Sequence, residues 1–183
     1  MKKVIVFLAE GFEEVEALTS VDLLRRAGAQ VVAMTINDRE NVEGAHDIEV
    51  VADSVFDKTE LEDADAIILP GGMPGTINLK NNPDIEEAVK TFYKTGKLVC
   101  AICAAPMILG TLGLLKGKKA CCYPGMEDYL EGAEVKTDLV CRDGNIITGQ
   151  GVGGAIAFAL EIIDYLFGPE DAGEIKESVV YKF

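Results

Sequence analysis

Four short, almost purely apolar runs constrain the fold of this 183-residue chain more than any other feature. Such runs are typical of strands that are buried on both faces of a parallel sheet. Helical patterns follow three of the four runs, as expected where crossover helices join parallel strands. We therefore predict an α/β fold, a three-layer sandwich in which a mostly parallel sheet has helices on both faces. The predicted strands are Val4–Leu8, Val31–Ile36, Ala66–Leu69 and Leu98–Ile102.

Turn-forming and capping residues divide the rest of the chain into further elements. We predict helices over residues 11–28, 82–93, 106–112 and 155–167, followed by a short charged helix after Gly168-Pro169. The Asp143-Gly144 pair between apolar residues predicts a hairpin over residues 139–148. We also predict a short hairpin or irregular arm over residues 41–52, a loop over 70–75 and a short strand over 118–122.

Length and composition exclude several classes of protein. One domain over residues 1–183 is expected from the length, and no repeat or linker interrupts it. The formal net charge of −14 argues against nucleic acid as a partner, because phosphates would be repelled. No apolar run is long enough to span a membrane, so no membrane partner is expected. Five cysteines, an odd number, suggest free thiols in a reducing compartment, which predicts a cytoplasmic protein.

Cys103 stands where a predicted strand turns sharply into a predicted helix. A turn of this kind lifts one side chain off the end of the sheet, as in a nucleophile elbow. Backbone N–H groups and the positive end of the helix dipole favour thiolate over thiol at such a place. Pro106 suits the first helical turn because its missing N–H costs nothing there. A buried, inert cysteine is the alternative, and this stretch alone does not decide between them.

Two other polar features also follow predicted parallel strands. Because the C-terminal ends of parallel strands lie at one edge of the sheet, where ligands bind, these features should lie close to Cys103. Glu16 follows the first strand, and a carboxyl beside a thiolate would have a raised pKa and could relay protons. Gly71 and Gly72 follow the third strand and offer two backbone N–H donors for an oxyanion hole. Taken separately, Glu16 also fits a solvated helix face, and the glycines also fit a tight turn.

Other chemistries have less support in the sequence. Cys100 and Cys103 form a C-x-x-C, but the first cysteine lies inside a predicted strand instead of at a helix start, which argues against a redox pair. His46 is the single histidine, and no second C-x-x-C is present, so we expect no metal. The glycines at 149, 151 and 154 match G-x-G-x-x-G after the last strand instead of the first, so we expect no dinucleotide cofactor. Cys121 or Cys122 as a resolving thiol for Cys103 remains an alternative.

Three motifs make the chain resemble the DJ-1/ThiJ/PfpI family, in particular its Parkinson-associated branch and the bacterial relatives. They are Gly11-x-Glu13-Glu14-x-Glu16, Leu69-Pro70-Gly71-Gly72 and residues 101–106, Ala-Ile-Cys-Ala-Ala-Pro. The resemblance implies a flavodoxin-like sandwich and a homodimer. It implies Cys103 as the oxidisable nucleophile, Glu16 as its proton donor and acceptor, and no cofactor.

The resemblance also implies a set of supporting residues. Gly71, Gly72 and Ala104 would bind the oxyanion or the substrate. Arg26, Tyr123 and Gly151 would contact the site residues without binding the substrate themselves. Two positions depart from the family pattern. Tyr123 replaces a histidine just before Pro124, which puts strong glyoxalase activity in doubt, and Val152 replaces a proline.

Family members are described as cofactor-independent glyoxalases, protein deglycases, chaperones and peroxide sensors. By this resemblance we expect a cysteine-dependent deglycase or glyoxalase whose partner is a small dicarbonyl such as methylglyoxal, or an early glycation adduct. A non-catalytic peroxide sensor or redox-regulated chaperone that uses Cys103 is the first alternative. A protein of unknown activity that carries the family's thiamine thiazole-biosynthesis label is the second. A peptidase is disfavoured because Cys103 has no histidine base beside it in the sequence pattern.

Overall fold

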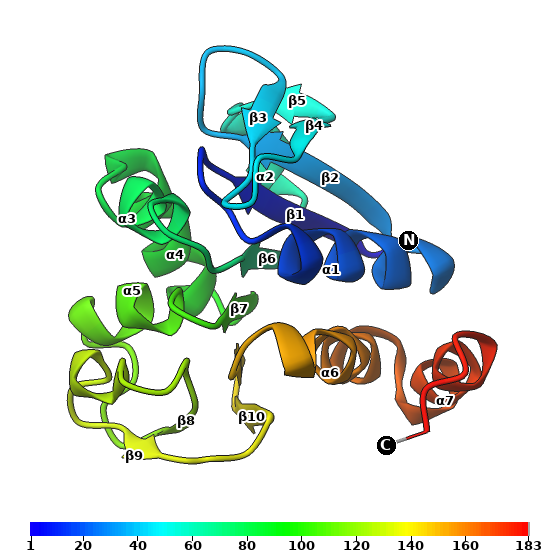
Figure 1. The fold of residues 1–183 in the computed structure, drawn as a ribbon. Helices are drawn as coiled ribbons and strands as arrows, with labels where there is room; N and C mark the ends of the chain where they lie inside the picture. The colour runs from blue at the N-terminus through cyan, green and yellow to red at the C-terminus, as the bar shows by residue number, and fades with distance from the viewer. Residues whose placement is uncertain (183) are drawn as a thin grey trace.

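The structure is a computed structural model that describes residues 1–182 (Figure 1). Its centre is a seven-stranded sheet in the order β10-β11-β7-β6-β1-β2-β5. Every neighbouring pair is parallel except β10 and β11, which form an antiparallel hairpin at one edge. The strands are β1 (Lys3–Leu8), β2 (Gln30–Thr35), β5 (Ser54–Val55), β6 (Ala66–Leu69), β7 (Leu98–Ile102), β10 (Val140–Asp143) and β11 (Ile146–Gly149).

Helices pack on both faces of this sheet and make the three layers. Residues of α1 and α6 share one apolar cluster, and residues of α4 and α5 share the other (Figure 1). The helices are α1 (Glu14–Arg26), α2 (Thr59–Glu62), α3 (Gly75–Lys80), α4 (Pro83–Lys94), α5 (Pro106–Thr111), α6 (Ala155–Phe167) and α7 (Pro169–Ser178), with 3-10 turns η1 (Glu127–Tyr129) and η2 (Val152–Gly154).

Alternating side chains of the central strand divide the core between the two faces. In β1, Val4, Val6 and Leu8 join the cluster beneath α1 and α6, whereas Ile5 and Phe7 join the opposite one. This period of two is the geometry of any strand. Because helices cover both faces, every position of the strand is apolar, and this explains why a continuous apolar run in the sequence identified it.

The predicted fold class is confirmed, and most predicted elements match. The arm over residues 41–52 is a small antiparallel hairpin of β3 (Asn41–Glu43) and β4 (Glu49–Val51). One helix was not predicted, and one predicted strand was wrong in extent. The helix is α3, which covers residues 75–80 directly after the predicted loop over 70–75. The strand predicted over 118–122 shrinks to β8 (Lys119–Ala120), which pairs with β9 (Glu134–Val135) outside the main sheet.

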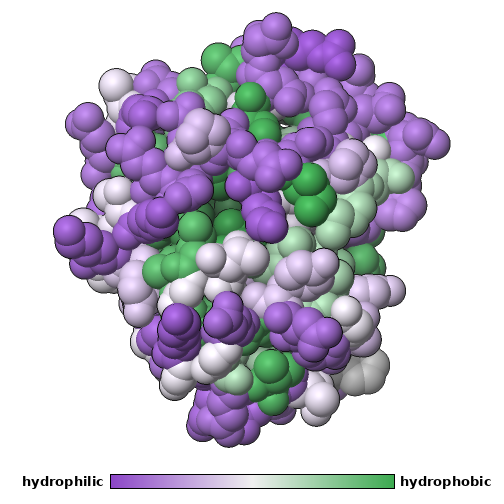
Figure 2. Space-filling view, turned by 90° about the vertical axis from the view of Figure 1, so that its left-hand side faces the viewer, coloured by the Kyte–Doolittle hydropathy of each residue, from purple (hydrophilic) through white to green (hydrophobic). Residues whose placement is uncertain are grey.

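The surface on the left-hand side of Figure 1 is shown face-on in Figure 2. Hydrophilic side chains cover most of it, and apolar surface lies recessed between them (Figure 2). Within residues 1–182, no helix combines the length and the hydropathy that crossing a bilayer would require.

The strand order explains where a site can form. The chain runs from β1 to β2 on one side and later returns to β6 on the other side of β1. Such a switch point opens a crevice at the C-terminal strand ends. The loops after β1, β6, β7 and β11, four neighbouring parallel strands, all meet there.

Candidate active site

Cys103 occupies the sharp turn between β7 and α5, as predicted. Its φ of +64° lies in the left-handed region, which is uncommon for a residue other than glycine. Two backbone hydrogen bonds hold this conformation: Cys103 N donates to Gly149 O at 2.9 Å, and Tyr123 N donates to Cys103 O at 2.8 Å. The side chain remains partly exposed, unlike those of the other four cysteines, which are buried. A strained, accessible thiol at the end of a central strand is typical of a nucleophile.

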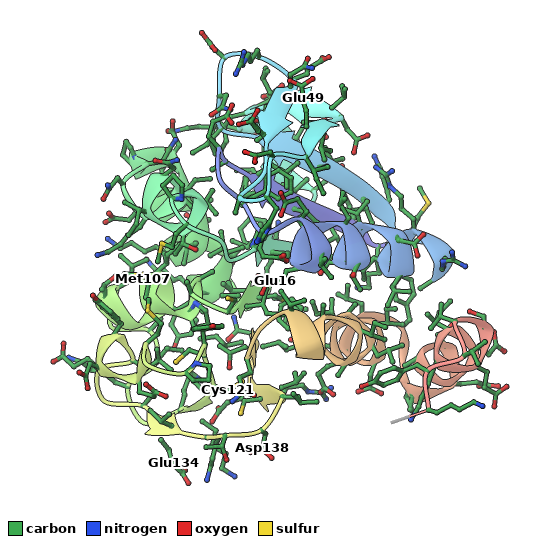
Figure 3. The ribbon with its side chains drawn as sticks, viewed as in Figure 1. Glu16, Glu49, Met107, Cys121, Glu134 and Asp138 are labelled. Atoms are coloured by element: carbon green, nitrogen blue, oxygen red, sulfur yellow. The ribbon has the colours of Figure 1, made fainter. Side chains whose placement is uncertain are left out.

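Glu16 lies in the first turn of α1 and is fully buried at the centre of the molecule (Figure 3). Gly71 N donates a 2.9 Å hydrogen bond to its Oε2. Its other oxygen, Oε1, has no hydrogen-bond partner among the described residues. Glu13 caps the same turn, because its Oε2 accepts a 2.7 Å hydrogen bond from Glu16 N. The solvated helix face considered for Glu16 is therefore excluded by its burial.

Two glycines show how closely the Glu16 carboxyl and the Cys103 thiol approach each other. A Cβ atom built on Gly71 would lie 2.6 Å from Cys103 Cβ and 2.7 Å from Glu16 Oε2, so no larger residue fits there. A Cβ atom built on Gly151 would lie 3.9 Å from Glu16 Oε1 and 4.0 Å from Cys103 Sγ. The unpartnered oxygen and the sulfur therefore face the same point in space.

Burial dominates the electrostatics of this pair. Burial raises the pKa of Glu16 from 4.5 to about 7. Burial, and then the interaction with the nearby Glu16 carboxyl, raise the pKa of Cys103 to about 12. Near neutral pH the Cys103 thiol therefore keeps its proton and the Glu16 carboxyl is about half ionised, so its ionised form can accept the thiol proton when the sulfur attacks. The predicted rise in the Glu16 pKa is confirmed in direction, but burial is the main cause instead of repulsion by a thiolate.

The main chain favours the Cys103 thiolate, as expected, but it does not by itself decide the protonation of the thiol. Backbone hydrogen bonds from Ala104 and Gly72 do lower the pKa of the thiol, but burial and Glu16 raise it further. The donor set also differs from the predicted one. Gly72 and Ala104 are directed at the sulfur, whereas the Gly71 N–H is used by Glu16 and is not free for an oxyanion.

Arg26, predicted to stand behind the site, does not lie there. It ends α1, whereas Glu16 lies at the start of that 13-residue helix. Its guanidinium is half exposed and pairs with Asp22 at 2.7 Å one turn away. The cation fits the negative end of the helix dipole, which explains its position without a catalytic role.

A pocket of about 380 Å³ opens at Gly151, where an added Cβ atom would lie 4.0 Å from the Cys103 sulfur. Tyr123 and Gly151 belong to its wall, and a Cβ atom on Gly151 would meet Tyr123 Cδ2 at 3.5 Å. Sequence reasoning missed Leu139 as a wall residue, because it reads as the first residue of a hairpin. The lining residues are Tyr123, Pro124, Leu139, Gln150, Gly151, Val152, Gly153 and Gly154.

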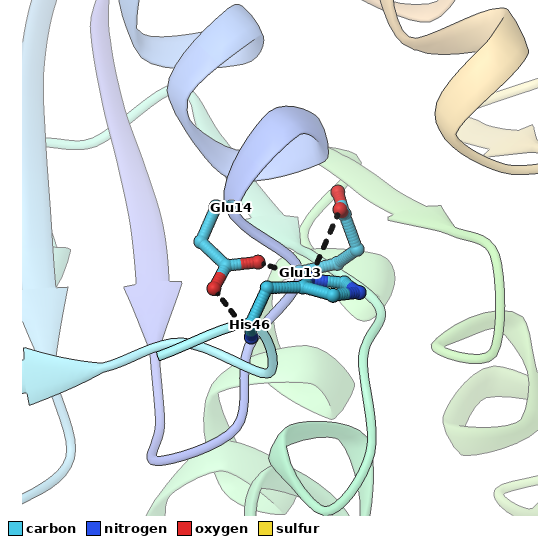
Figure 4. Close-up of side chains that lie close together, drawn as sticks. All are labelled: Glu13, Glu14 and His46. Carbon is cyan, nitrogen blue, oxygen red and sulfur yellow. Dashed lines mark hydrogen bonds and ion pairs between the residues drawn. The ribbon is translucent and has the colours of Figure 1, made fainter. Parts of the chain in front are cut away.

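His46 pairs with two acidic residues at the start of α1 (Figure 4). His46 N donates to Glu14 Oε1 at 2.7 Å, and His46 Nδ1 lies 2.7 Å from Glu14 Oε2 and 3.9 Å from Glu13 Oε1. Since a carboxylate only accepts, Nδ1 carries the proton. Ligand atoms of the three residues lie within 4.8 Å of one another, so they could reach one metal ion, but here Glu14 uses both oxygens for His46.

The remaining cysteines are buried in the fold. Cys100 is fully buried in β7, so it is no surface redox partner for Cys103. Cys121, which is labelled in Figure 3, is fixed by Thr148, whose Oγ1 accepts a hydrogen bond from Cys121 N at 3.0 Å. Cys122 is buried, and this burial raises the pKa of its thiol to about 11.

Comparison with known proteins gives a consistent result over the whole chain. A family model described as "DJ-1/PfpI family" matches residues 2–165. The chain is 33% identical to protein dj-1beta of Drosophila melanogaster over 184 residues, which covers 100% of this chain and 98% of that protein. It is 35% identical over 167 residues to a Caenorhabditis elegans protein named glutathione-independent glyoxalase DJR-1.2, with 91% and 89% of the two chains covered.

Solved structures agree with this similarity. An oxidized DJ-1 of Toxoplasma gondii superposes with a TM-score of 0.95 at 38% identity and 100% coverage of both chains. A DJ-1 superfamily protein of Salmonella typhimurium gives a TM-score of 0.94 at 36% identity and the same coverage. The chain spans about half the length of two Arabidopsis thaliana relatives, DJ-1 homologs B and A, since it covers 42% and 47% of them.

Proposed function

The chain belongs to the DJ-1/PfpI family, and from that premise we propose that it is a cysteine-dependent glyoxalase acting on small 2-oxoaldehydes. One observation carries the proposal: the buried Glu16 carboxyl leaves a single oxygen, Oε1, without a partner, and that oxygen faces the Cys103 sulfur. A relative named as a glutathione-independent glyoxalase supports the choice of reaction.

The first step is addition of sulfur to the aldehyde. Glu16, with a pKa of about 7, accepts the thiol proton as the Cys103 sulfur attacks the aldehyde carbon. The product is a hemithioacetal whose oxyanion is bonded to the same carbon as the sulfur, two bonds from it. The N–H groups of Gly72 and Ala104, which hydrogen-bond the sulfur, are near enough to stabilise that charge.

The second step moves a proton within the substrate. Once Glu16 has returned its proton to the oxyanion, its carboxylate removes the hydrogen of the former aldehyde carbon as a proton, which leaves an enediol, and delivers it to the neighbouring carbon. The hydroxyl proton on the first carbon passes to the oxygen of the second carbon in the same rearrangement. The hemithioacetal thereby becomes a thioester of a 2-hydroxy acid. Water then cleaves the thioester, which releases the acid and regenerates the Cys103 thiol. Methylglyoxal plus one water gives lactate, with no net oxidation and no cofactor.

Early glycation adducts belong to the same proposal as a second substrate class. A hemithioacetal or aminocarbinol on a protein regenerates the free aldehyde, which Cys103 would capture in the same way. Deglycase activity would then follow from glyoxalase chemistry instead of needing another site.

The decisive test is the formation of lactate from methylglyoxal by purified protein without glutathione. We expect activity from the wild type and a loss of at least about 10³-fold in Cys103→Ser, because the serine hydroxyl is a far weaker nucleophile with this base. Cys141→Ser, at a buried cysteine on the edge strand, is the matched control and should retain activity. Equal rates in the wild type and Cys103→Ser would refute the proposal.

A peroxide sensor is the second candidate, favoured by the partial exposure of Cys103 among buried thiols and by the amides on its sulfur. Oxidation to the sulfinate would add two oxygen atoms to the sulfur. Intact mass after mild peroxide treatment separates the candidates. A stable gain of two oxygens, absent in Cys103→Ser, without lactate formation by the untreated protein would favour the sensor.

We further propose that the chain forms a homodimer in the cytoplasm. Val15 and Leu18 of α1 are exposed apolar side chains three residues apart, on one face of the helix. Light scattering should give twice the chain mass of 19.6 kDa, and Leu18→Glu should lower it toward one chain. A monomeric wild type would contradict the dimer and leave the proposed chemistry unaffected.

A further inference from the structure

We propose that the mouth of the pocket selects uncharged 2-oxoaldehydes that carry an apolar alkyl or aryl group and discriminates against anionic ones. This inference rests on the proposed function and adds a substrate class to it. The inference is based on three exposed apolar side chains, Tyr123, Leu139 and Val152, which line the pocket next to Gly151 and the Cys103 sulfur.

The passage itself is fixed by Gly151. A side chain there would begin 4.0 Å from Cys103 Sγ, 3.9 Å from Glu16 Oε1 and 3.5 Å from the Tyr123 ring. Gly151 also lines the pocket, so the space beside its backbone lies between the pocket and the reacting atoms. An aldehyde carbon held at the sulfur must extend its substituent through this space into the pocket.

The pocket mouth offers that substituent an apolar surface. Tyr123, Leu139 and Val152 are about half exposed, whereas most large apolar side chains of the chain are buried. Exposed apolar side chains that gather at the mouth of a cavity are typical of a ligand-binding surface. An alkyl or phenyl group placed among them would remove apolar surface from water on both sides.

The charges argue against an anionic substituent. None of the described residues that line the pocket carries a charged side chain, so a carboxylate or phosphate would lose its hydration without gaining an ion pair. The Glu16 carboxylate lies just behind Gly151, and the chain as a whole has a net charge of −14. Both would repel an anion from the passage.

Matched substrates test the charge preference. We expect phenylglyoxal to exceed 4-carboxyphenylglyoxal in kcat/KM by on the order of tenfold, since the two differ only in a distal carboxylate. Val152→Lys should bring this ratio close to one by placing a cation at the mouth. Val135→Lys on β9, an equally charged change at another exposed valine, should leave the wild-type ratio in place.

A separate variant tests the preference for apolar substituents. Leu139→Ser should lower the ratio of kcat/KM for phenylglyoxal over methylglyoxal by about fivefold, whatever the intrinsic reactivities of the two aldehydes. Turnover of methylglyoxal with no discrimination by charge or size would overturn this inference and leave the proposed function standing. Failure to turn over any 2-oxoaldehyde would instead overturn the proposed function.

Alkylation of Cys103 tests the pocket without any turnover. Iodoacetamide and iodoacetate deliver groups of similar size that differ in charge, and intact mass reports both. The ratio of their rates at Cys103 should exceed the ratio for glutathione by on the order of tenfold, and Val152→Lys should reduce that excess where Val135→Lys does not. A ratio equal to that of glutathione, or equal effects of the two lysines, would overturn the inference.

Discussion

Gly71 and Glu16 are joined by a 2.9 Å hydrogen bond from the Gly71 N–H to Oε2 of the carboxyl. This bond decides which oxygen remains for chemistry, because it occupies Oε2 and leaves Oε1 toward the sulfur. It joins the loop after β6 to the first turn of α1, two segments that are distant in sequence. The glycine-rich loop therefore serves to orient the base, whereas Gly72 and Ala104 serve the nucleophile.

Activity should rise with pH through the pKa of Glu16. Below about pH 7 the carboxyl is protonated and cannot accept the thiol proton, so kcat/KM for methylglyoxal should fall about tenfold per pH unit on the acid side. The Cys103 pKa of about 12 lies beyond the accessible range, so no second limb is expected below pH 9. Glu16→Gln should lose about 10²- to 10⁴-fold in rate and lose this acid limb. An unchanged limb in that variant would assign it to another group.

Gly71→Ala should uncouple the base from the nucleophile. The added Cβ would overlap both Cys103 Cβ at 2.6 Å and Glu16 Oε2 at 2.7 Å, so the two side chains must move apart. A displacement of this size should cost about 10²-fold in kcat/KM, and overpacking should cost about 1–3 kcal/mol in the free energy of unfolding. Gly173→Ala on α7, where a Cβ meets nothing within 4 Å, is the control. Wild-type kinetics in Gly71→Ala would contradict the positioning role.

Glu16 should also reduce the stability of the protein above neutral pH. Its pKa is about 7 in the folded chain against 4.5 for the free group, so the folded state binds the proton more tightly. Stability linked to this group is therefore present below pH 4.5 and falls as the pH rises toward 7, by about 3 kcal/mol in all. Glu16→Gln removes that loss, and we expect its Tm to exceed the wild-type Tm by roughly 8 °C at pH 8 and to match it near pH 4.5. Thermal unfolding at the two pH values checks this, and an equal shift at both would point to packing instead of charge.

The sheet and the convergence of the site could be predicted because the sequence carries local signals for them. The unbroken apolar runs indicate strands that are buried on both faces. The small residues and the proline after Cys103 indicate the sharp turn from strand to helix. Once parallel strands are accepted, the C-terminal ends bring Glu16 and Cys103 together without further information.

The finer features could not be predicted because they depend on distances across the fold. Which glycine N–H serves Glu16 is decided by contacts between β6 and α1. The resting protonation of Cys103 is decided by burial, which outweighs the amides that the sequence motif implied. Arg26 lies at the far end of α1, and a cation at this position is typical of a helix C-terminus instead of a binding site. Leu139 enters the pocket wall only because the β10–β11 hairpin folds back beside β7.

His46 should stabilise the fold only while it is charged, and His46→Gln tests this by keeping a donor and removing the charge. Glu14 is buried beside the imidazole, and Glu13 and Asp47 also face it, so these carboxylates raise the pKa of His46 and it lowers that of Glu14. Because the pKa of His46 is raised in the folded state, its stabilisation is complete below pH 6.5 and is lost as the pH rises through the folded pKa. Because the pKa of Glu14 is lowered in the folded state, its stabilisation is present above pH 4.5 and is lost as the pH falls through the folded pKa. The two windows overlap between these values. His46→Gln should therefore lower the Tm most near pH 5.5 and least near pH 9, where the neutral imidazole and the amide both donate to Glu14 (Figure 4). A Tm difference that does not change with pH would show that shape, not charge, holds the arm to α1.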